Sequence, residues 1–420
     1  MRRSLSSKSS NSSLSSPASS YQEEPQSPLE PYDANRDYVM VIGGLGYIGS
    51  HTTLELLKAG NNVIVVDNLS NAFETVFTRI QKLSKDHWAA QGKDAPYLKL
   101  HKMDYRSPLM RNVLGRYMIR APAFGETRLS HIAGVIHFAA YKSVSESIEK
   151  PLDYYQNNIC GLVELLILLG DFGIHNFVFS SSATVYGSKA NEGKPLHEEH
   201  LVHHPQMHTD ESGAEVTLVP GAAGITSPYG RTKYFGEAIL ADVAEANPSW
   251  RITALRYFNP VGCEETGMLC EDPRQKPTNL FPVISQVLTG KKPILEVFGS
   301  DWETHGTAVR DFIHVSDLAL GHLAALKAAP ERPPQHAFRS YNLGTGSGST
   351  VAEVVACMEV AAERQVPKVM SGRRAGDVGY CVAMTDRATR ELGWSTQKSI
   401  AECASSLWNA LKVSGQLASA

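Results

Sequence analysis

YVMVIGGLGYIGSHT, residues 38–52, is the strongest structural signal in this chain. It opens with a short apolar run typical of a buried strand, and a helical pattern follows its glycine-rich loop. Glycines at this spacing let the backbone approach a pyrophosphate, which then lies at the positive N-terminus of the next helix. The stretch therefore predicts a strand, turn and helix that bind a dinucleotide.

The surrounding sequence repeats this strand-and-helix pattern. Apolar runs bounded by turn residues recur as NVIVVD, YLKLHKM, GVIHFAA, NFVFSSS and RITALRY. Residues 47–59, 151–172 and 228–246 carry apolar positions at helical spacing, as expected of crossovers between parallel strands. We therefore predict an α/β fold with a doubly wound parallel Rossmann sheet.

The composition divides the chain into a tail, a cofactor domain and a smaller lobe. Residues 1–36 are rich in Ser and Pro and are expected to be a disordered tail. The basic start of this tail also resembles a mitochondrial presequence, although Leu5 and Leu14 make a poor amphipathic face. Residues 37–258 are assigned to a Rossmann domain that binds the dinucleotide. Residues 259–420, with helices near 316–328 and 350–364, are assigned mainly to a smaller C-terminal α/β substrate-binding lobe.

Two segments of the cofactor domain look inserted. Residues 119–133 and 189–224 lack periodicity, and we expect both to be surface loops. The second holds five histidines beside Glu198 and Glu199. Such a group could bind a metal, but a solvated loop explains it as well, and we assign no metal.

The overall composition excludes several classes of partner. A net charge of −3 gives no field that would gather nucleic acid or an anionic membrane surface. The six cysteines lack CxxC spacing, which indicates a reducing compartment rather than a disulfide framework. The longest apolar run, Leu165–Leu169, is far shorter than the ~20 residues of a membrane helix. We expect a cytoplasmic protein.

Two acidic residues follow strands beside the glycine loop. Asp67 ends the second strand, 18 residues beyond Gly49, where a carboxylate can accept both adenosine ribose hydroxyls. This favours NAD over NADP. Asp104 follows the third strand, where it either contacts the adenine edge or serves as a turn residue.

A tyrosine and a lysine supply the predicted chemistry. Tyr229 and Lys233 are spaced i, i+4 in SPYGRTK and share one helical face. A nearby ammonium and a positive nicotinamide both favour phenolate, so Tyr229 can act as a base near neutral pH. Ser182, at the end of NFVFSSS, can hold a substrate hydroxyl beside that oxygen. We predict Ser182, Tyr229 and Lys233 as the catalytic residues.

Nine motifs together resemble those of the extended short-chain dehydrogenases/reductases and, within them, the UDP-glucose 4-epimerase family. The resemblance runs from Tyr38 to about Leu411. The motifs are GGLGYIGSHT (43–52), VVDNLSN (65–71), FAAYKSVSES (138–147), SSSATVYG (180–187), SPYGRTK (227–233), RYFNPVG (256–262), VRDFIHVSDLA (309–319), YNLGTG (341–346) and RRAGD (373–377).

The resemblance implies a full set of binding residues. The expected cofactor-binding residues are Gly43, Gly46, Tyr47, Ile48, Gly49, Asp67, Asn68, Asn71, Asp104, Tyr105, Phe138, Ala139, Lys142, Asn157, Tyr229, Lys233 and Tyr257. The expected substrate-binding residues, with the arginines on the UDP pyrophosphate and Phe298 near the uracil, are Ser182, Tyr229, Asn259, Asn279, Phe298, Arg310, Arg374, Asp377 and Cys381.

The resemblance also implies the reaction. Dehydratases and decarboxylases of this superfamily carry acids where this chain has Ala183 and Thr184. What remains is oxidation at C4 of a UDP-hexose and return of the hydride to the opposite face, with NAD regenerated in each cycle. The small Cys381 stands where some relatives carry Tyr, so we expect UDP-N-acetylhexosamines to be accepted as well. A related NAD-dependent nucleotide-sugar epimerase, or an NAD sensor without catalysis, remains the alternative.

The helical pattern also bears on assembly. Helices 151–172 and 228–246 carry apolar residues on more than one face, including Ile159, Leu162, Leu166 and Leu169. Such faces fit either a subunit contact or burial inside one large core. Members of the family usually pair through these helices, so we expect a homodimer.

Overall fold

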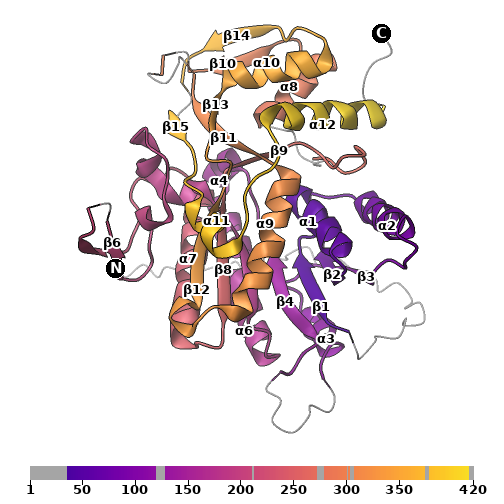
Figure 1. The fold of residues 1–420 in the computed structure, drawn as a ribbon, viewed down its shortest axis with the longest axis vertical. Coiled ribbons are helices and arrows are strands. Elements are labelled where there is room, and N and C mark those ends of the chain that lie inside the picture. Colours follow the sequence, from indigo (N-terminus) through magenta and orange to yellow (C-terminus); the bar gives the residue numbers. More distant parts are fainter. Residues whose placement is uncertain are drawn as a thin grey trace, which may run out of the picture. The chain divides into compact units, whose positions relative to one another are not determined.

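The seven-stranded sheet is the centre of the fold. The computed structural model describes residues 36–119, 128–210, 212–271, 279–299, 301–302, 307–373 and 378–415. The strand order is β12-β8-β5-β4-β1-β2-β3, and every neighbouring pair is parallel, which confirms the predicted doubly wound sheet (Figure 1). Its strands are β1 (Tyr38–Ile42), β2 (Asn62–Asp67), β3 (Leu98–Lys102), β4 (Ile132–His137), β5 (Asn176–Ser182), β8 (Arg251–Tyr257) and β12 (Phe338–Leu343).

The strand order reverses beside β1. From β1 the chain builds β2 and β3 on one side and then returns to place β4 on the other. All five residues of β1 are buried, as expected for a central parallel strand covered on both faces. A reversal of this kind opens a crevice at the carboxyl ends of the strands, where ligands of such sheets bind.

Helices cover both faces of this sheet. Helix α1 (Tyr47–Lys58) packs against α2 (Glu74–Ala89) and α9 (Val315–Ala328). Val178 of β5 belongs to the apolar cluster under α1 and α9, whereas its neighbour Phe179 contacts Gly236 of α7 (Pro228–Ala246) on the other face. Shorter helices are α3 (Leu109–Gly115), α4 (Val144–Glu149) and α11 (Asp386–Leu392).

The helix predicted at 151–172 is interrupted. It consists of α5 (Pro151–Tyr155), a π-helical turn over Gln156–Cys160, and α6 (Gly161–Asp171). The apolar periodicity predicted the helix but carried no signal for the wider turn. Turns of this type are frequent at functional sites, and this one contains two buried asparagines, Asn157 and Asn158.

Within the residues that the structure describes, the smaller lobe contains two short sheets and three helices, and Figure 1 shows it at one end of the main sheet. Its own core contains Phe281, Phe312, Met358 and Trp408. Strand β11 (Val309–His314) pairs with β9 (Asn259–Val261), β13 (Gly348–Thr350) and β15 (Tyr380–Cys381). The remaining elements are β10 (Leu295–Phe298), β14 (Lys368–Ser371), α8 (Leu280–Leu288), α10 (Val351–Ala362) and α12 (Ile400–Val413).

The chain does not stay in the smaller lobe after residue 258. The helix expected at 316–328 forms as α9, but it packs against α1 on the main sheet. Strand β12 then joins the edge of that sheet beside β8. Residue 258 therefore marks the first departure of the chain from the main sheet, and later segments return to it. No helix of the described residues combines the length and apolar character needed to cross a membrane.

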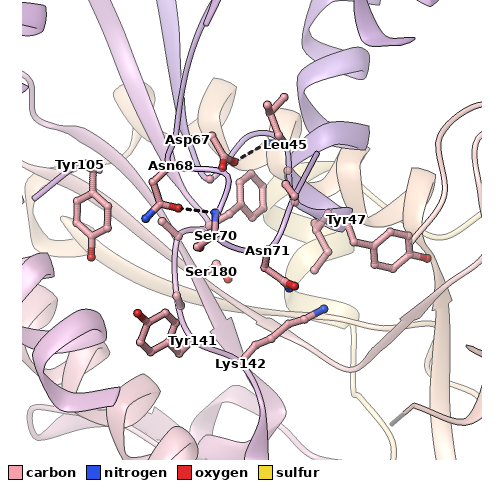
Figure 2. A pocket seen from close by; sticks show the side chains of 18 of the residues that line it. Leu45, Tyr47, Asp67, Asn68, Ser70, Asn71, Tyr105, Tyr141, Lys142 and Ser180 are labelled. Carbon is pink, nitrogen blue, oxygen red and sulfur yellow. Dashed lines mark hydrogen bonds between the residues drawn. The ribbon is translucent and has the colours of Figure 1, made fainter. Parts of the chain in front are cut away.

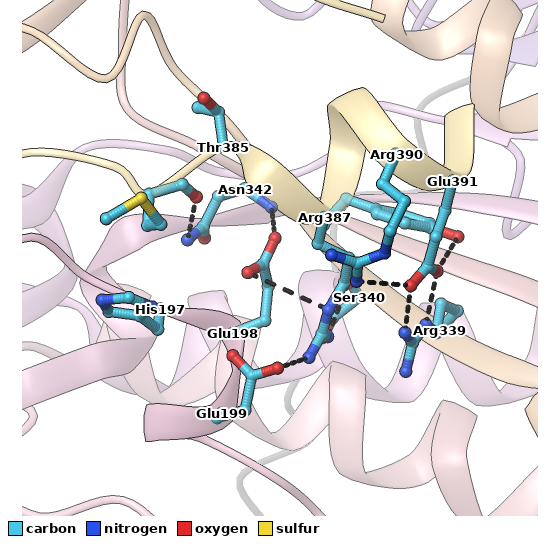
Figure 3. Close-up of polar contacts among 12 residues, drawn as sticks. His197, Glu198, Glu199, Arg339, Ser340, Asn342, Thr385, Arg387, Arg390 and Glu391 are labelled. Carbon is cyan, nitrogen blue, oxygen red and sulfur yellow. Dashed lines mark hydrogen bonds and ion pairs between the residues drawn. The ribbon is translucent and has the colours of Figure 1, made fainter. Parts of the chain in front are cut away.

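The segment 189–224 is only partly a surface loop, which corrects the sequence-based expectation. Its hairpin of β6 (Gln206–Thr209) and β7 (Glu215–Leu218) is largely exposed. Leu196, Glu198 and Leu201 are buried. Figure 3 shows the polar contacts that anchor this part, where Glu198 accepts a hydrogen bond from the backbone N–H of Asn342 at 2.8 Å. Of the other insertion, residues 120–127 lie outside the described residues and Ile132 begins β4.

Candidate active site

The glycines between β1 and α1 are needed for different structural reasons. Gly43 has a φ of +79°, and a Cβ there would lie 2.7 Å from the backbone nitrogen of Ala139. A Cβ on Gly49 would lie 2.2 Å from the carbonyl oxygen of Gly43. A Cβ on Gly46 would meet only that same oxygen, at 3.5 Å. Folding therefore requires Gly43 and Gly49, whereas the space above Gly46 fits the close approach of a dinucleotide pyrophosphate.

The carboxylate of Asp67 lies beside this loop at the end of β2. Its two oxygens accept hydrogen bonds from the backbone N–H groups of Leu45 and Leu69, each at 2.9 Å, and Figure 2 shows the bond to Leu45. Burial raises the pKa of Asp67, and these two hydrogen bonds oppose that rise. The side chain is thus held at the rim of the loop, where the predicted ribose contact needs it.

A cleft at the carboxyl ends of the strands collects most of the predicted cofactor residues. It is lined by Gly43, Gly46, Tyr47, Ile48, Gly49, Asp67, Asn68, Asn71, Tyr105, Phe138, Ala139, Lys142, Asn157, Tyr229, Lys233 and Tyr257. Sequence reasoning missed other lining residues, among them Ser70, Tyr141, Ser180, Cys270 and Glu271. No sequence pattern marks these residues as cofactor contacts, because they line the cleft only as neighbours of the motif residues.

Asp104 is placed differently from the other cofactor candidates. Its carboxylate accepts hydrogen bonds from the backbone and side chain of Arg106 and from Asn68. Burial raises the pKa of Asp104, but the contacts with Arg106 outweigh it and the net pKa is lowered. These contacts favour the second of the two sequence-based interpretations, a turn residue after the third strand, which positions Asn68.

The π-helical turn forms one wall of the cleft. Asn158 accepts hydrogen bonds from the backbone N–H of Tyr141 and from the side chain of Asn157, both at 2.9 Å. It donates to Thr232 of α7 at 3.0 Å. The hydroxyl of Tyr105 donates to the backbone oxygen of Asn157 at 2.8 Å. Asn158, which sequence reasoning did not single out, therefore links this wall to the helix that carries Tyr229.

Two of the predicted catalytic residues, Tyr229 and Lys233, line the cleft, and the third, Ser182, is hydrogen-bonded to Tyr229. Ser227 caps α7 by accepting a hydrogen bond from the backbone N–H of Gly230 at 3.1 Å, so Tyr229 lies in the first helical turn. The hydroxyls of Ser182 and Tyr229 are hydrogen-bonded to each other. Ser182 also accepts a hydrogen bond from the hydroxyl of Thr184 at 3.0 Å. The proton of Ser182 is thus directed away from Thr184 and toward Tyr229.

Burial dominates the electrostatics of Tyr229 and Lys233. It raises the pKa of Tyr229 to about 12, with the hydrogen bond from Ser182 opposing the rise. It lowers the pKa of Lys233 to about 7, with Glu237 opposing the fall. The ammonium of Lys233 lies 5.9 Å from the centre of the Tyr229 ring and donates to the backbone oxygen of Ser180. Within the described chain, the hydrogen bond from Ser182 favours the phenolate of Tyr229.

A buried ion pair fixes the helix that carries Tyr229 and Lys233. Glu237, one turn after Lys233, pairs with Arg256 of β8 at 2.7 Å, and both side chains are fully buried. The hydroxyl of Ser181 also donates to Glu237. His203, from the inserted segment, contacts the same carboxylate at 3.0 Å. The helix that carries the catalytic pair is thereby tied to β5, β8 and the insertion.

Tyr257 is held by a buried histidine. Nδ1 of His322 lies 2.8 Å from the backbone oxygen of Leu318, an acceptor, so this nitrogen carries the proton. Nε2 is then an acceptor, and the hydroxyl of Tyr257 donates to it. Burial lowers the pKa of His322 to about 4, so the ring is neutral near pH 7. This bond fixes the hydroxyl of Tyr257 at the wall of the cleft.

Four of the five histidines of the insertion are dispersed into separate contacts. His203 contacts Glu237, His204 contacts Asp242 at 2.9 Å, and the rings of His197 and His200 pack against each other. Among the residues that the structure describes, no group of three His, Cys, Asp or Glu side chains could hold a metal ion.

The predicted substrate residues lie around β11 and in the smaller lobe. Asn259 donates to the backbone oxygen of Asp311 at 3.0 Å. Arg310 of β11 is the register partner of Cys381, so these two residues lie side by side. Asn279 immediately precedes α8 and Phe298 ends β10. Two further candidates, Arg374 and Asp377, lie outside the described residues.

Comparisons with known proteins agree with this geometry. Residues 39–344 match the NAD dependent epimerase/dehydratase family. The chain is 42% identical over 373 residues to UDP-glucose 4-epimerase 2 of Arabidopsis thaliana, covering 88% of this chain and 94% of that protein. It is 39% identical over 377 residues to human UDP-glucose 4-epimerase, covering 88% and 95%. The crystal structure of UDP-glucose 4-epimerase from Bifidobacterium longum in complex with NAD+ and UDP is 37% identical, with a TM-score of 0.75 and coverage of 90% and 99%.

Proposed function

The chain belongs to the NAD dependent epimerase/dehydratase family, and from this premise we propose that it is an isomerase that interconverts UDP-glucose and UDP-galactose at C4 of the hexose. It uses NAD as its cofactor. The observation that carries the proposal is Tyr229, which lines the dinucleotide cleft and is hydrogen-bonded to Ser182. This pair can hold a hydroxyl and exchange its proton.

Each catalytic residue has a distinct part in the reaction. Tyr229 accepts the proton of the C4 hydroxyl and returns it after the sugar has turned in the site. Ser182 positions that hydroxyl, because its own proton is already directed to Tyr229. Lys233 fixes the catalytic helix against β5 through Ser180. The cleft residues, among them Gly46, Asp67 and Tyr257, would hold NAD, which when bound would supply the hydride acceptor and donor for C4.

The residues beside Ser182 favour epimerisation over elimination. Loss of water or carbon dioxide from a 4-keto sugar needs an additional acid or base in the site. Ala183 and Thr184 cannot act in this way, and the hydroxyl of Thr184 is engaged with Ser182. With no such group at these two positions, the hydride returns to the sugar it came from.

The substrate contacts belong to the same proposal. We assign the pyrophosphate to Arg310 and Arg374, whose forked side chains suit phosphate oxygens. Asp377 binds the uridine ribose, Phe298 contacts the uracil, and Asn259 and Asn279 bind the sugar-phosphate portion. On this assignment residues 37–258 bind mainly NAD and residues 259–420 mainly UDP-sugar. The small side chain of Cys381 leaves room for an N-acetyl group at C2, which extends the substrates to UDP-N-acetylglucosamine and UDP-N-acetylgalactosamine.

A direct assay tests the function. Purified protein is incubated with UDP-galactose, without added NAD, and the appearance of UDP-glucose is measured. We expect turnover by the native chain and a fall in kcat of roughly 10²- to 10⁴-fold in Tyr229→Phe. Tyr234→Phe, on the same helix outside the cleft lining, is the matched control and keeps its activity. If the native protein binds NAD but produces no UDP-glucose from UDP-galactose, it is an NAD-binding sensor and the proposal fails.

A homodimer in the cytoplasm completes the proposal. Leu162, Leu166 and Leu169, which the sequence offered for a subunit contact, are buried within the chain. Other apolar side chains on these helices are exposed, including Leu152 (78%), Ile167 (62%) and Phe235 (41%). Helices α5 and α7 contact each other, and the Tyr155 and Phe235 rings lie 6.2 Å apart. Sedimentation of the native chain and of Leu152→Arg tests this surface. We expect the native chain to sediment as a dimer and the substitution to weaken that dimer.

A further inference from the structure

Two cysteines face each other across a tight loop beside the cofactor cleft. The backbone N–H of Glu264 donates to the oxygen of Leu269 at 3.0 Å, and that of Gly267 donates to the oxygen of Glu264 at 2.8 Å. These bonds fold the loop back on itself, so Cys263 and Cys270 leave it as opposite neighbours. Adjacent chains in this arrangement bring facing side chains close together.

The two thiols are in contact and are reduced. Cys270 lies within hydrogen-bonding reach of Cys263, and neither takes part in a disulfide. The contact with Cys270, followed by burial, raises the pKa of Cys263. Cys263 is fully buried, whereas Cys270 is partly exposed and lines the NAD cleft. The pair therefore has one accessible member and one protected member.

Neighbouring residues fix the backbone beside Cys263, whereas Cys270 lies in the lining of the cleft. The hydroxyl of Tyr47 donates to the backbone oxygen of Gly262 at 2.6 Å, and the backbone N–H of Cys263 donates to Ser406 at 3.1 Å. At the other end of the loop, Glu271 forms an ion pair with Lys142 at 3.1 Å. Both Glu271 and Lys142 line the cleft. Cys270 is thus the chain neighbour of Glu271, whose ion pair with Lys142 lies in the wall of the cleft.

We propose that Cys263 and Cys270 are a reversible oxidation site that closes to a disulfide and is shielded by bound NAD. With hydrogen peroxide as oxidant, the sulfur of Cys270 attacks the O–O bond, becomes a sulfenic acid and releases water. The sulfur of Cys263 then attacks that sulfenic sulfur, the S–S bond forms, and the second oxygen leaves as water. Two thiols and one peroxide give one disulfide and two waters, and a dithiol reductant reverses the step by exchange.

Oxidation and NAD binding are linked. A bond between the sulfurs is about 2.05 Å long, so its formation draws Cys270 from the cleft toward Cys263 and displaces Glu271 from Lys142. Because the coupling between two equilibria is reciprocal, the disulfide weakens NAD binding to the same extent that NAD disfavours the disulfide. Cys160, exposed at the end of the π-helical turn, has no part in this coupling.

The experiment follows the thiols and does not depend on turnover. Both cysteines lie between Arg256 and Arg274, so one tryptic peptide carries them. The full-length protein is treated with hydrogen peroxide, trapped with N-ethylmaleimide and mapped by mass spectrometry. We expect an unlabelled peptide, lighter than the dithiol by two hydrogen atoms, which dithiothreitol returns to the doubly labelled form. Cys263→Ser stops at the sulfenic acid of Cys270, and Cys160→Ser behaves as the native chain.

The coupling to NAD is measured in two samples whose bound nucleotide has been determined by extraction, one saturated and one depleted. Oxidation requires an open cleft, so its rate falls roughly tenfold at a free NAD concentration about ten times the dissociation constant. Two labels on this peptide after peroxide treatment would overturn the oxidation site. Equal oxidation rates in the two samples would overturn the shielding by NAD.

Discussion

The ammonium of Lys233 donates a hydrogen bond to the backbone oxygen of Ser180, two residues before Ser182 on the same strand. This bond joins the helix that carries Tyr229 to the strand that carries Ser182. One turn further along α7, Glu237 receives a hydrogen bond from Ser181. Two successive residues of β5 are therefore attached to the catalytic helix, which holds the two hydroxyls in register.

The buried lysine makes stability depend on pH. Burial lowers the pKa of Lys233 from 10.5 to about 7. Between these values the unfolded chain keeps a proton that the folded chain has lost, so the free energy of unfolding rises as the pH rises. Relative to Lys233→Met, we expect the native chain to gain roughly 1–3 kcal/mol between about pH 7 and about pH 9.5. Urea unfolding at several pH values measures it, and parallel curves would contradict the prediction.

Glu237→Gln should be strongly destabilising. The substitution leaves Arg256 charged and fully buried without its carboxylate, which costs roughly 3–5 kcal/mol for a pair of this kind. Asp86→Asn is the matched control, because its partner Lys82 and Asp86 are each 60% exposed. That control should change stability by less than about 0.5 kcal/mol. Equal effects of the two substitutions on urea unfolding would show that the buried pair has no special weight.

Gly46→Ala and Gly49→Ala should separate cofactor binding from folding. The chain has room for a methyl group at Gly46, so stability changes by less than about 1 kcal/mol. The NAD dissociation constant should nevertheless rise at least about tenfold, or ~1.4 kcal/mol. At Gly49 the methyl group meets the Gly43 oxygen, and we expect a loss of about 3 kcal/mol in stability. Calorimetric titration with NAD and thermal unfolding distinguish the two effects, and unchanged NAD affinity in Gly46→Ala would refute the assignment.

Cys381→Tyr tests the proposed room for an N-acetyl group. The larger side chain beside Arg310 should lower kcat/KM for the N-acetylated UDP-sugars at least about a hundredfold, or ~2.7 kcal/mol. UDP-glucose and UDP-galactose should still be interconverted. Cys381→Ser, which keeps the size of the side chain, is the control and should retain both activities. The size argument is wrong if the N-acetyl pair is turned over equally by Cys381→Tyr and the native chain.

The cofactor site could be predicted from local sequence. The glycine loop, Asp67 at a strand end and the i, i+4 pair Tyr229 and Lys233 each depend on residues close together in the chain. Spacing of this kind translates directly into one turn, one strand end or one helical face. The carboxyl ends of parallel strands meet at one edge, so the order of the strands was enough to bring these separate motifs into one cleft.

Other features depended on contacts between distant segments. The segment 189–224 gave no periodic signal, yet His203 contacts Glu237 and Glu198 contacts Asn342 inside the protein. The apolar pattern of 151–172 predicted a helix but not the π-helical turn that places Asn158. In each case the deciding contact joins polar side chains whose partners have no fixed offset in sequence.

The sequence by itself determined that this chain binds NAD and carries a Ser, Tyr and Lys set without an additional acid, because those properties belong to short motifs and to residue identity. Only the tertiary structure decided how these three side chains are positioned and which protonation states they favour. Burial, a property of the whole packed chain, sets the pKa values of Tyr229 and Lys233. Burial also determines which thiol of the Cys263 and Cys270 pair lines the cleft.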